Sequence, residues 1–213
     1  MHWYVCMRLS CFKSTLLTIA VWVSAPIAAE QFKYLDADII FQETASGQSE
    51  AIKRATASPY SHVGILYYDK GTPYVFEAVQ PVKRSSLAAF IRRSVGGRYV
   101  VKRLKNRDAE LDAAKLSRMR AAGKKFVGKN YDWTFGWSDE RIYCSELVWK
   151  IYRNGAGIEL APLKKLKEFN LGDRVVQKKM KERYGKNIPY EEPVVSPGQL
   201  FESPFLETVF EKR

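Results

Sequence analysis

"RIYCSELVWKIYRNG", residues 141–155, places Cys144 directly ahead of an apolar run with helical spacing. We predict a helix from about Ser145 to Asn154, with Gly155 ending it. The free N–H groups and the dipole at the start of such a helix would stabilise a thiolate on Cys144 and an oxyanion beside it. The stretch therefore indicates a nucleophile at a helix start, although a lone cysteine is more often a small buried residue.

A thiolate nucleophile needs a proton acceptor, and His62 is the candidate. It lies in "SHVGILYYD", which with "PYVFEAV" flanks "DKGT" in a pattern typical of a β-hairpin. If the hairpin turns at Lys70-Gly71, Gly64 pairs with Glu77, and His62 and Glu77 share one face as diagonal neighbours. Glu77 would then orient the imidazole. A slip of one residue in the pairing would place the two side chains on opposite faces.

Three further residues are candidates for contact with the substrate or its oxyanion. Tyr60 and Tyr143, next to His62 and Cys144 in the sequence, could donate hydrogen bonds to substrate, although tyrosines more often only pack. Ser145 opens the predicted helix, so its N–H group is a candidate for the oxyanion. We expect no metal or organic cofactor, since the carboxylates that could suggest a metal site have no metal-loop spacing: Asp38, Asp132 and Glu146.

Residues 1–29 are predicted to be a secretory signal peptide. Arg8 and Lys13 precede "STLLTIAVWVSAPIAA", an apolar stretch that is short for a bilayer-spanning helix and ends in small residues. We expect cleavage near Ala29 and a mature protein of one domain, residues 30–213, in the periplasm or cell envelope. Retention of the leader as an N-terminal anchor is the alternative.

Cleavage would leave a single cysteine and a single histidine. Cys6, Cys11 and His2 would leave with the leader, so Cys144 could form no internal disulfide. A lone thiol in an oxidising compartment indicates a residue that is either reactive or well buried. Any pairing of cysteine with histidine in the mature chain must then join Cys144 to His62.

The chain is strongly basic. Its formal net charge of +12 falls to +10 without the leader, and the cations concentrate in residues 83–129 and 164–186. This charge favours anionic surroundings such as cell-wall polymer or phospholipid headgroups. Nucleic acid is not expected as a partner, because export removes it and no zinc-finger or RNP-type motif is present. The sequence does not indicate an oligomeric state.

The order of elements indicates an α+β domain and argues against the regular alternation of a doubly wound sheet. Besides the hairpin and the cysteine helix, we predict a strand at 39–41, a short helix in "SEAIKRATAS", a brief helix in "SLAAFIRRS", a strand in "RYVVKRL", and a longer helix in "DAELDAAKLSRMRAAGKKFVG" that Gly128 closes. From about residue 161 onward the pattern assigns no element.

Several of these segments together resemble the YaeF/YiiX group of permuted papain-like amidases, a circularly permuted branch of the NlpC-type cysteine hydrolase superfamily: "DIIFQ", "SHVGILYYDKGTPYVFEAVQPVK", "YVVKRL", "NYDWTF" and "IYCSELVWKIY". The resemblance covers most of the mature chain. It implies a circularly permuted papain-like fold, in which a small antiparallel sheet packs against helices that include the cysteine-bearing one. It also implies Cys144 as nucleophile, His62 as base and Glu77 as the third member. Ala37 stands before Asp38 where this family would have glycine, which puts the local turn in question.

The implied activity is cysteine-dependent hydrolysis of amide bonds through an acyl-enzyme on Cys144. Export and basic charge favour a cell-wall peptide, a murein-derived amide or a lipid-linked amide as substrate. One alternative is a lipid acyl hydrolase or acyltransferase with the same triad. Another is a non-catalytic cell-envelope binding module with a basic face. The intact set of Cys, His and Glu argues against this second alternative.

Overall fold

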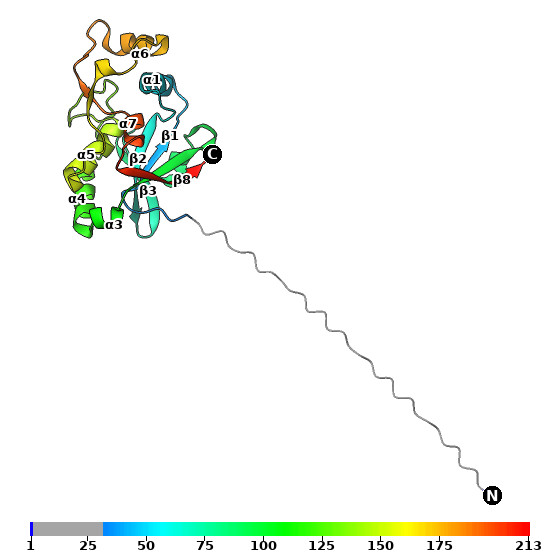
Figure 1. Ribbon diagram of the computed structural model, residues 1–213. Helices are drawn as coiled ribbons and strands as arrows, with labels where there is room; N and C mark the ends of the chain where they lie inside the picture. The colour runs from blue at the N-terminus through cyan, green and yellow to red at the C-terminus, as the bar shows by residue number, and fades with distance from the viewer. Residues whose placement is uncertain (2–31) are drawn as a thin grey trace. The chain divides into compact units, whose positions relative to one another are not determined.

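The computed structural model describes Met1 and residues 32–213, and Figure 1 traces the course of the chain. The predicted signal peptide, its cleavage site near Ala29, and Cys6 and Cys11 lie outside the described residues. Residues 32–213 form one compact unit. Within the described part of the chain, no helix has the length and apolar character needed to cross a lipid bilayer.

An antiparallel sheet of six strands organises this unit, with the strand order β4-β3-β2-β1-β5-β8. Its strands are β1 (Ile39–Gln42), β2 (His62–Asp69), β3 (Thr72–Glu77), β4 (Lys83–Ser86), β5 (Tyr99–Leu104) and β8 (Leu206–Lys212). A separate two-stranded ribbon joins β6 (Lys164–Lys165) to β7 (Pro193–Val194). The first strand, the hairpin and β5 were predicted, whereas β4, β6, β7 and β8 were not.

Helices pack around this sheet, which confirms the α+β class. They are α1 (Gly47–Thr56), α2 (Leu87–Ile91), α3 (Arg107–Glu110), α4 (Ala113–Lys124), α5 (Cys144–Ala156), α6 (Arg174–Tyr184) and α7 (Pro197–Phe201), with 3₁₀ turns at Val95–Gly97 and Leu166–Glu168. In Figure 1, α4 lies beside α5, and α1 lies near α6.

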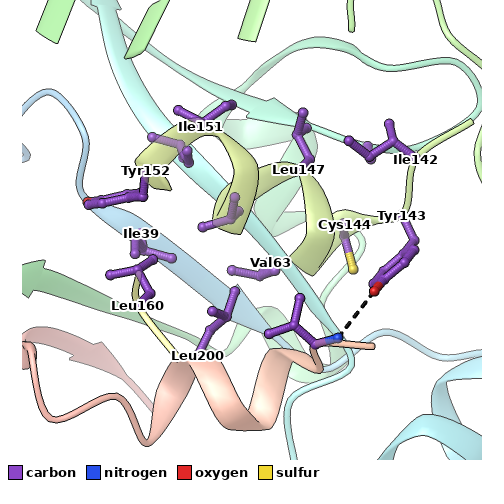
Figure 2. Close-up of a cluster of buried hydrophobic side chains, with 14 of the residues drawn as sticks. Ile39, Val63, Ile142, Tyr143, Cys144, Leu147, Ile151, Tyr152, Leu160 and Leu200 are labelled. Atoms are coloured by element: carbon purple, nitrogen blue, oxygen red, sulfur yellow. Dashed lines mark hydrogen bonds between the residues drawn. The ribbon is translucent and has the colours of Figure 1, made fainter. Parts of the chain in front are cut away.

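The helix that begins at Cys144 lies against the middle of the sheet. Leu147 and Ile151 of α5 are fully buried together with Val63 of β2 and Ile39 of β1, as Figure 2 shows. Removing each such side chain from water contributes about 1.5–3 kcal/mol. A smaller cluster on the opposite face of the sheet includes Phe90 of α2. The cysteine is therefore held by the best-packed part of the molecule.

The register of the hairpin agrees with the turn inferred from the sequence. Asp69 pairs with Thr72 and Ile65 with Phe76, so the turn falls at Lys70-Gly71. Continuing this register brings Gly64 opposite Glu77. A Cβ atom at Gly64 would lie 2.4 Å from a methyl group of Val75, so the close approach of the two strands requires glycine there.

The end of the cysteine helix was wrongly predicted. Gly155 lies inside α5, which continues to Ala156 and is capped by Gly157 in the left-handed region at φ 76°. Gly155 has a different role, because a Cβ atom there would lie 2.4 Å from the Cα of Met119 in α4. It allows the two helices to pack closely.

The longer helix predicted ahead of Gly128 is two helices. Asp112 separates α3 from α4, and its carboxylate accepts a hydrogen bond from the N–H of Lys115 at 2.6 Å, an N-cap that starts the second helix. The second helix ends at Lys124. Gly128 lies beyond it, in a turn at φ 80° whose N–H donates to the carbonyl of Val82.

The turn at Ala37 forms despite the absence of glycine. Ala37 is buried and adopts φ 72°, the left-handed conformation that glycine tolerates best. This conformation explains why the family pattern has glycine at this position. Tyr152 of α5 donates a hydrogen bond to the Ala37 carbonyl at 2.5 Å. The adjacent Asp38 binds Arg103 at 2.7 Å, so both neighbours hold the turn in place.

Candidate active site

Cys144 is the first residue of α5, and its side chain is 2% exposed. Tyr143 precedes it in extended conformation, so the chain enters the helix abruptly and leaves the first-turn N–H groups free of intrahelical partners. The N–H groups of Val63 and Ser145 lie near enough to the Cys144 sulfur to favour its thiolate form. Figure 2 shows the sulfur at the open end of the helix, beside the ring of Tyr143.

His62 begins β2 and Glu77 ends β3, and the hairpin brings them together. His62 Nε2 lies 2.6 Å from Glu77 Oε2, and both side chains are buried. The imidazole stacks on the ring of Phe90 with 5.5 Å between centroids. Because Nε2 is engaged by Glu77, Nδ1 is the ring nitrogen left for the Cys144 thiol, which lies near enough to raise the pKa of His62. Of the predicted site residues, these three are brought into one chain of contacts.

The contacts among these three residues favour charged side chains. Burial by itself raises the pKa of the Cys144 thiol, but the hydrogen bond and charge of His62, together with the two N–H groups, lower it below its ordinary value. Burial lowers the pKa of His62, and its bonds to Cys144 and Glu77 outweigh this and raise the pKa to about 9. The structure thus favours a thiolate beside an imidazolium.

Glu77 carries the third charge of the group. Burial raises its pKa, but the hydrogen bond and charge of His62, a hydrogen bond from Ser85 and the charge of Arg93 lower it to about 2. Arg93 Nη2 lies 2.5 Å and 2.6 Å from the two carboxylate oxygens. The negative charge of Glu77 is therefore shared between the histidine and the arginine.

Arg93 was not identified from the sequence. It lies in "FIRRS", where nothing distinguishes it from Arg92. Its contact with Glu77 depends on the path of the chain through β4 and α2, neither of which carries a pattern that points to the hairpin. The two adjacent arginines were the only sequence feature that could have pointed to this contact. They do not indicate which of the two side chains faces the site.

Tyr131 is a second residue that sequence reasoning missed. Its hydroxyl receives a hydrogen bond from Gln48 Nε2 at 3.3 Å and lies near Cys144. Burial and the nearby cysteine raise the pKa of Tyr131 well above its ordinary value, so it remains a neutral donor. Its only signal was its place in "NYDWTF", one of the segments that carries the family resemblance.

Tyr143 and Ser145 hold a neighbouring segment of the chain. The Tyr143 hydroxyl accepts a hydrogen bond from the N–H of Val195 at 3.2 Å, the dashed line in Figure 2, and Ser145 Oγ donates to the Val195 carbonyl at 2.8 Å. Both side chains are buried by these contacts. Tyr60 packs on Phe201 of α7 with 4.2 Å between ring centroids. The N–H of Ser145 is thus the part of these three residues that faces the sulfur.

An apolar pocket opens beside Cys144. It measures about 680 Å³ with its mouth included and lies between α1, α6 and the segment around Val195. Apolar side chains form most of its wall, among them Ala51, Phe169, Val176 and Met180, with the cations Lys179 and Arg183. Much of this volume is open to solvent, and the apolar wall suits an apolar part of a substrate.

The carboxylates considered for a metal site are each engaged elsewhere. Asp38 binds Arg103, and Asp132 accepts hydrogen bonds from the N–H groups of residues 134 and 136. Glu146 lies 2.8 Å from Lys150 Nζ, and burial raises its pKa to about 7 although Lys150 opposes the rise. Among the described residues, no three His, Cys, Asp or Glu side chains converge as a metal site requires.

Three comparisons with known proteins show which family and fold this chain resembles. Residues 34–210 match the model of the permuted papain-like amidase enzymes, the YaeF/YiiX, C92 family. The uncharacterized protein YiiX of Escherichia coli strain K12 is 47% identical over 197 residues, which are 92% of this chain and 95% of that protein. The crystal structure of metalloprotein yiiX from Escherichia coli O157:H7 aligns with a TM-score of 0.81 and 47% identity, covering 85% of this chain and 99% of that chain. The word metalloprotein describes that relative, and the described residues of this chain do not fit a metal centre of the kind tested above.

Proposed function

This chain belongs to the YaeF/YiiX, C92 family of permuted papain-like amidases, and on that basis we propose that it is an exported hydrolase that cleaves amide bonds through an acyl-enzyme on Cys144. The fold is the circularly permuted papain-like fold. The observation that carries the proposal is His62, which is buried, lies 2.6 Å from Glu77 Oε2 and is near enough to Cys144 for each to shift the pKa of the other. That arrangement matches a nucleophile, a base and an orienting carboxylate.

In the first half of the reaction, the Cys144 thiolate attacks the amide carbonyl carbon, and a C–S bond forms as the carbonyl oxygen takes up negative charge. The N–H of Ser145 and the hydroxyl of Tyr131 both lie beside the sulfur and are the donors in reach of that oxygen. Collapse of the intermediate breaks the C–N bond. The proton on His62 passes to the departing nitrogen, which leaves as an amine.

In the second half, water replaces the amine. His62, now neutral, accepts a proton from that water, whose oxygen attacks the thioester carbonyl. The C–S bond breaks, the acid leaves and Cys144 returns as a thiolate beside protonated His62. Glu77 holds the imidazole in one orientation throughout, since its hydrogen bond to Nε2 fixes the ring.

The substrate we favour is a cell-wall peptide or a related amide. The predicted export and the net charge of +10 that remains without the leader support an anionic envelope environment. A lipid acyl hydrolase or acyltransferase with the same triad is the second candidate, and a specific observation favours it: the wall of the pocket beside Cys144 is largely apolar, as an acyl chain requires.

Turnover of a panel of substrates tests the proposal. The full chain is incubated with murein peptides, aminoacyl amides and lipid esters, and Cys144→Ser serves as the matched control, because oxygen replaces sulfur with little change in volume but ionises far less readily. We expect one class to be cleaved and its acyl group to appear on Cys144 in the mass spectrum of the intact protein. If Cys144→Ser retains turnover, the reaction does not pass through Cys144 and the proposed mechanism is wrong. If no panel member is cleaved or acylates the wild-type thiol, the non-catalytic binding module becomes the better explanation.

A further inference from the structure

A second hollow adjoins the site on the side of His62. It measures about 1120 Å³ with its wide mouth included, and hydroxyl and amide side chains contribute to its wall, among them Thr44, Ser49, Ser61 and Gln48. His62 lines this hollow, whereas Cys144 lines the apolar pocket. Ile52 and Tyr131 line both, so the two spaces are neighbours, one on the side of Cys144 and the other on the side of His62.

The reaction assigns different parts of the substrate to the two spaces. The acyl group must stay bonded to Cys144, while the departing nitrogen must receive its proton from His62. The acyl group therefore belongs in the apolar pocket and the leaving amine in the hollow that His62 lines. This step rests on the proposed function.

The charges around the hollow then restrict the chemistry of the leaving group. Arg93 is the permanently charged side chain among the described residues that line it, and no Asp, Glu or Lys is among them. The nearby Glu77 is fully buried, and its charge is already shared by His62 and Arg93. A second ammonium on the leaving amine would face an arginine and an imidazolium with no counter-charge on the wall of the hollow, which disfavours it.

Arg93 has N–H donors that its described contacts do not use and that could bind an anion. A guanidinium carries five N–H donors. Nη2 donates to the two oxygens of Glu77 and Nη1 donates to the Ala89 carbonyl, so the Nε proton and one Nη1 proton remain among the described contacts. The Arg93 side chain is 38% exposed, at the wall of the hollow. Carboxylate and phosphate are the groups that a guanidinium binds best.

We propose that this hollow is a leaving-group subsite for amines that carry an anionic group, either a carboxylate or a phosphate, and that Arg93 recognises the anion. Trp133 contributes an exposed ring that packs on Tyr131 with 4.8 Å between centroids and forms one side of the subsite. The substrate is accordingly an amide with an apolar acyl group on one side and an acidic amine on the other.

Binding to the full-length Cys144→Ala variant tests this without turnover. The ligands are four N-decanoyl amides whose amines differ mainly in charge: glycine, O-phosphoethanolamine, neutral glycinamide and cationic ethylenediamine. Isothermal titration calorimetry should give the two anionic ligands a Kd at least tenfold lower than that of the cationic ligand, with the neutral ligand between them. The glycine and phosphoethanolamine arms distinguish a peptide-like from a headgroup-like anion. Equal affinity for all four would overturn the proposal.

Variants of the arginine pair assign the preference to one residue. In the Cys144→Ala background, Arg93→Gln should reduce the anion preference to less than threefold, and Arg93→Lys should keep part of it, because the positive charge remains. Arg92→Gln removes the same charge from the exposed neighbour outside the hollow and should preserve the preference. A preference that survives Arg93→Gln, or that Arg92→Gln removes equally, would contradict the assignment. Wild-type turnover of the same amides is a separate measurement, so a failure of the proposed hydrolysis is distinguishable from a failure of this subsite.

Discussion

Glu77 Oε2 lies 2.6 Å from Nε2 of His62, across the first and last positions of two paired strands. The relationship depends on the hairpin turn at Lys70-Gly71, since a shift of one residue would place the two side chains on opposite faces of the sheet. It also determines which ring nitrogen of His62 faces the thiol. The backbone register of a β-hairpin thus sets the orientation of the proposed base.

Cys144 should be alkylated quickly at mildly acidic pH. A free cysteine, with a pKa of about 8.5, is on the order of 0.3% thiolate at pH 6, whereas His62 lowers the pKa of the Cys144 thiol. We expect iodoacetamide to modify Cys144 at pH 6 at least ten times faster than free cysteine. The measurement uses full-length protein with Cys6→Ser and Cys11→Ser, so that Cys144 is the one thiol that iodoacetamide can modify.

Removal of the histidine supplies the control for that rate. His62→Ala takes away both the hydrogen bond and the positive charge that favour the thiolate, so its rate at pH 6 should fall below that of the unaltered site by at least tenfold. A rate that follows the pH dependence of free cysteine in both proteins would mean that no activated pair exists.

The lowered pKa of Glu77 predicts a dependence of stability on acid. A carboxylate with a folded-state pKa of about 2, against an ordinary value of 4.5, contributes stability that is fully present above pH 4.5 and is lost as the pH falls through about 2. The free energy of unfolding of wild type minus that of Glu77→Gln should therefore be constant between about pH 4.5 and 6.5, since above pH 6.5 the raised pKa of His62, to which Glu77 contributes, adds its own pH dependence. Below pH 4.5, the difference should decrease by about 3 kcal/mol in total. Urea titrations between pH 2 and 7 measure it, and a difference that stays constant down to pH 2 would exclude the charged pairing.

The contact between His62 and Glu77 and the helix start at Cys144 were predictable because both rest on local patterns. A tight turn fixed the relation of His62 to Glu77, and an apolar run placed Cys144 at a helix start. Arg93 and Tyr131 were not predictable in this way, because they reach the site from segments whose own patterns give no direction. Their positions depend on how β4, α2 and the loop before α5 cross the sheet, which is a property of the whole fold.

The errors at helix ends have a related cause. Gly155 follows an apolar run, as a terminating glycine does, but its role is contact with Met119 across two helices. Asp112 is an N-cap residue and could have indicated the start of a second helix. Because it lies within a stretch of good helix formers, the whole stretch was interpreted as one helix. The strand β8 alternates weakly and pairs with β5 from about 100 residues away along the chain, so no local signal marks its partner.

Gly155→Ala should destabilise the protein strongly for a helix-interior substitution. Alanine usually favours a helix over glycine by about 1 kcal/mol, but here its Cβ would lie 2.4 Å from the Met119 Cα. Separating α4 from α5 to admit it should cost about 1–3 kcal/mol in free energy of unfolding. Gly172→Ala is the control, since a Cβ atom there meets only Asn170 Oδ1 at 3.7 Å. Thermal unfolding of both variants checks the prediction, and equal stabilities would show that the two helices yield without cost.

Ala37→Gly should be neutral or stabilising, contrary to the usual effect of introducing glycine. Left-handed backbone costs alanine about 1–2 kcal/mol, and this offsets the flexibility that glycine adds to the unfolded chain. We expect the free energy of unfolding to rise by about 0–1 kcal/mol. Ala51→Gly, at a buried alanine within helix α1, should lower it by about 1 kcal/mol. Destabilisation of similar size in both variants would mean that the turn at residue 37 carries no strain.

Tyr131→Phe should separate stabilisation of the oxyanion from activation of the thiol. The hydroxyl of Tyr131 lies beside the sulfur, where an oxyanion would form, and loss of one such donor costs about 100- to 1000-fold in kcat. Ionisation of Cys144 depends mainly on His62 and on the N–H groups of Val63 and Ser145, so the rate of iodoacetamide alkylation at pH 6 should change by less than about threefold. Turnover and alkylation are measured on the same preparation. If both rates fall together, Tyr131 acts on the thiol itself; if neither falls, the oxyanion is held by backbone N–H groups without help from the tyrosine.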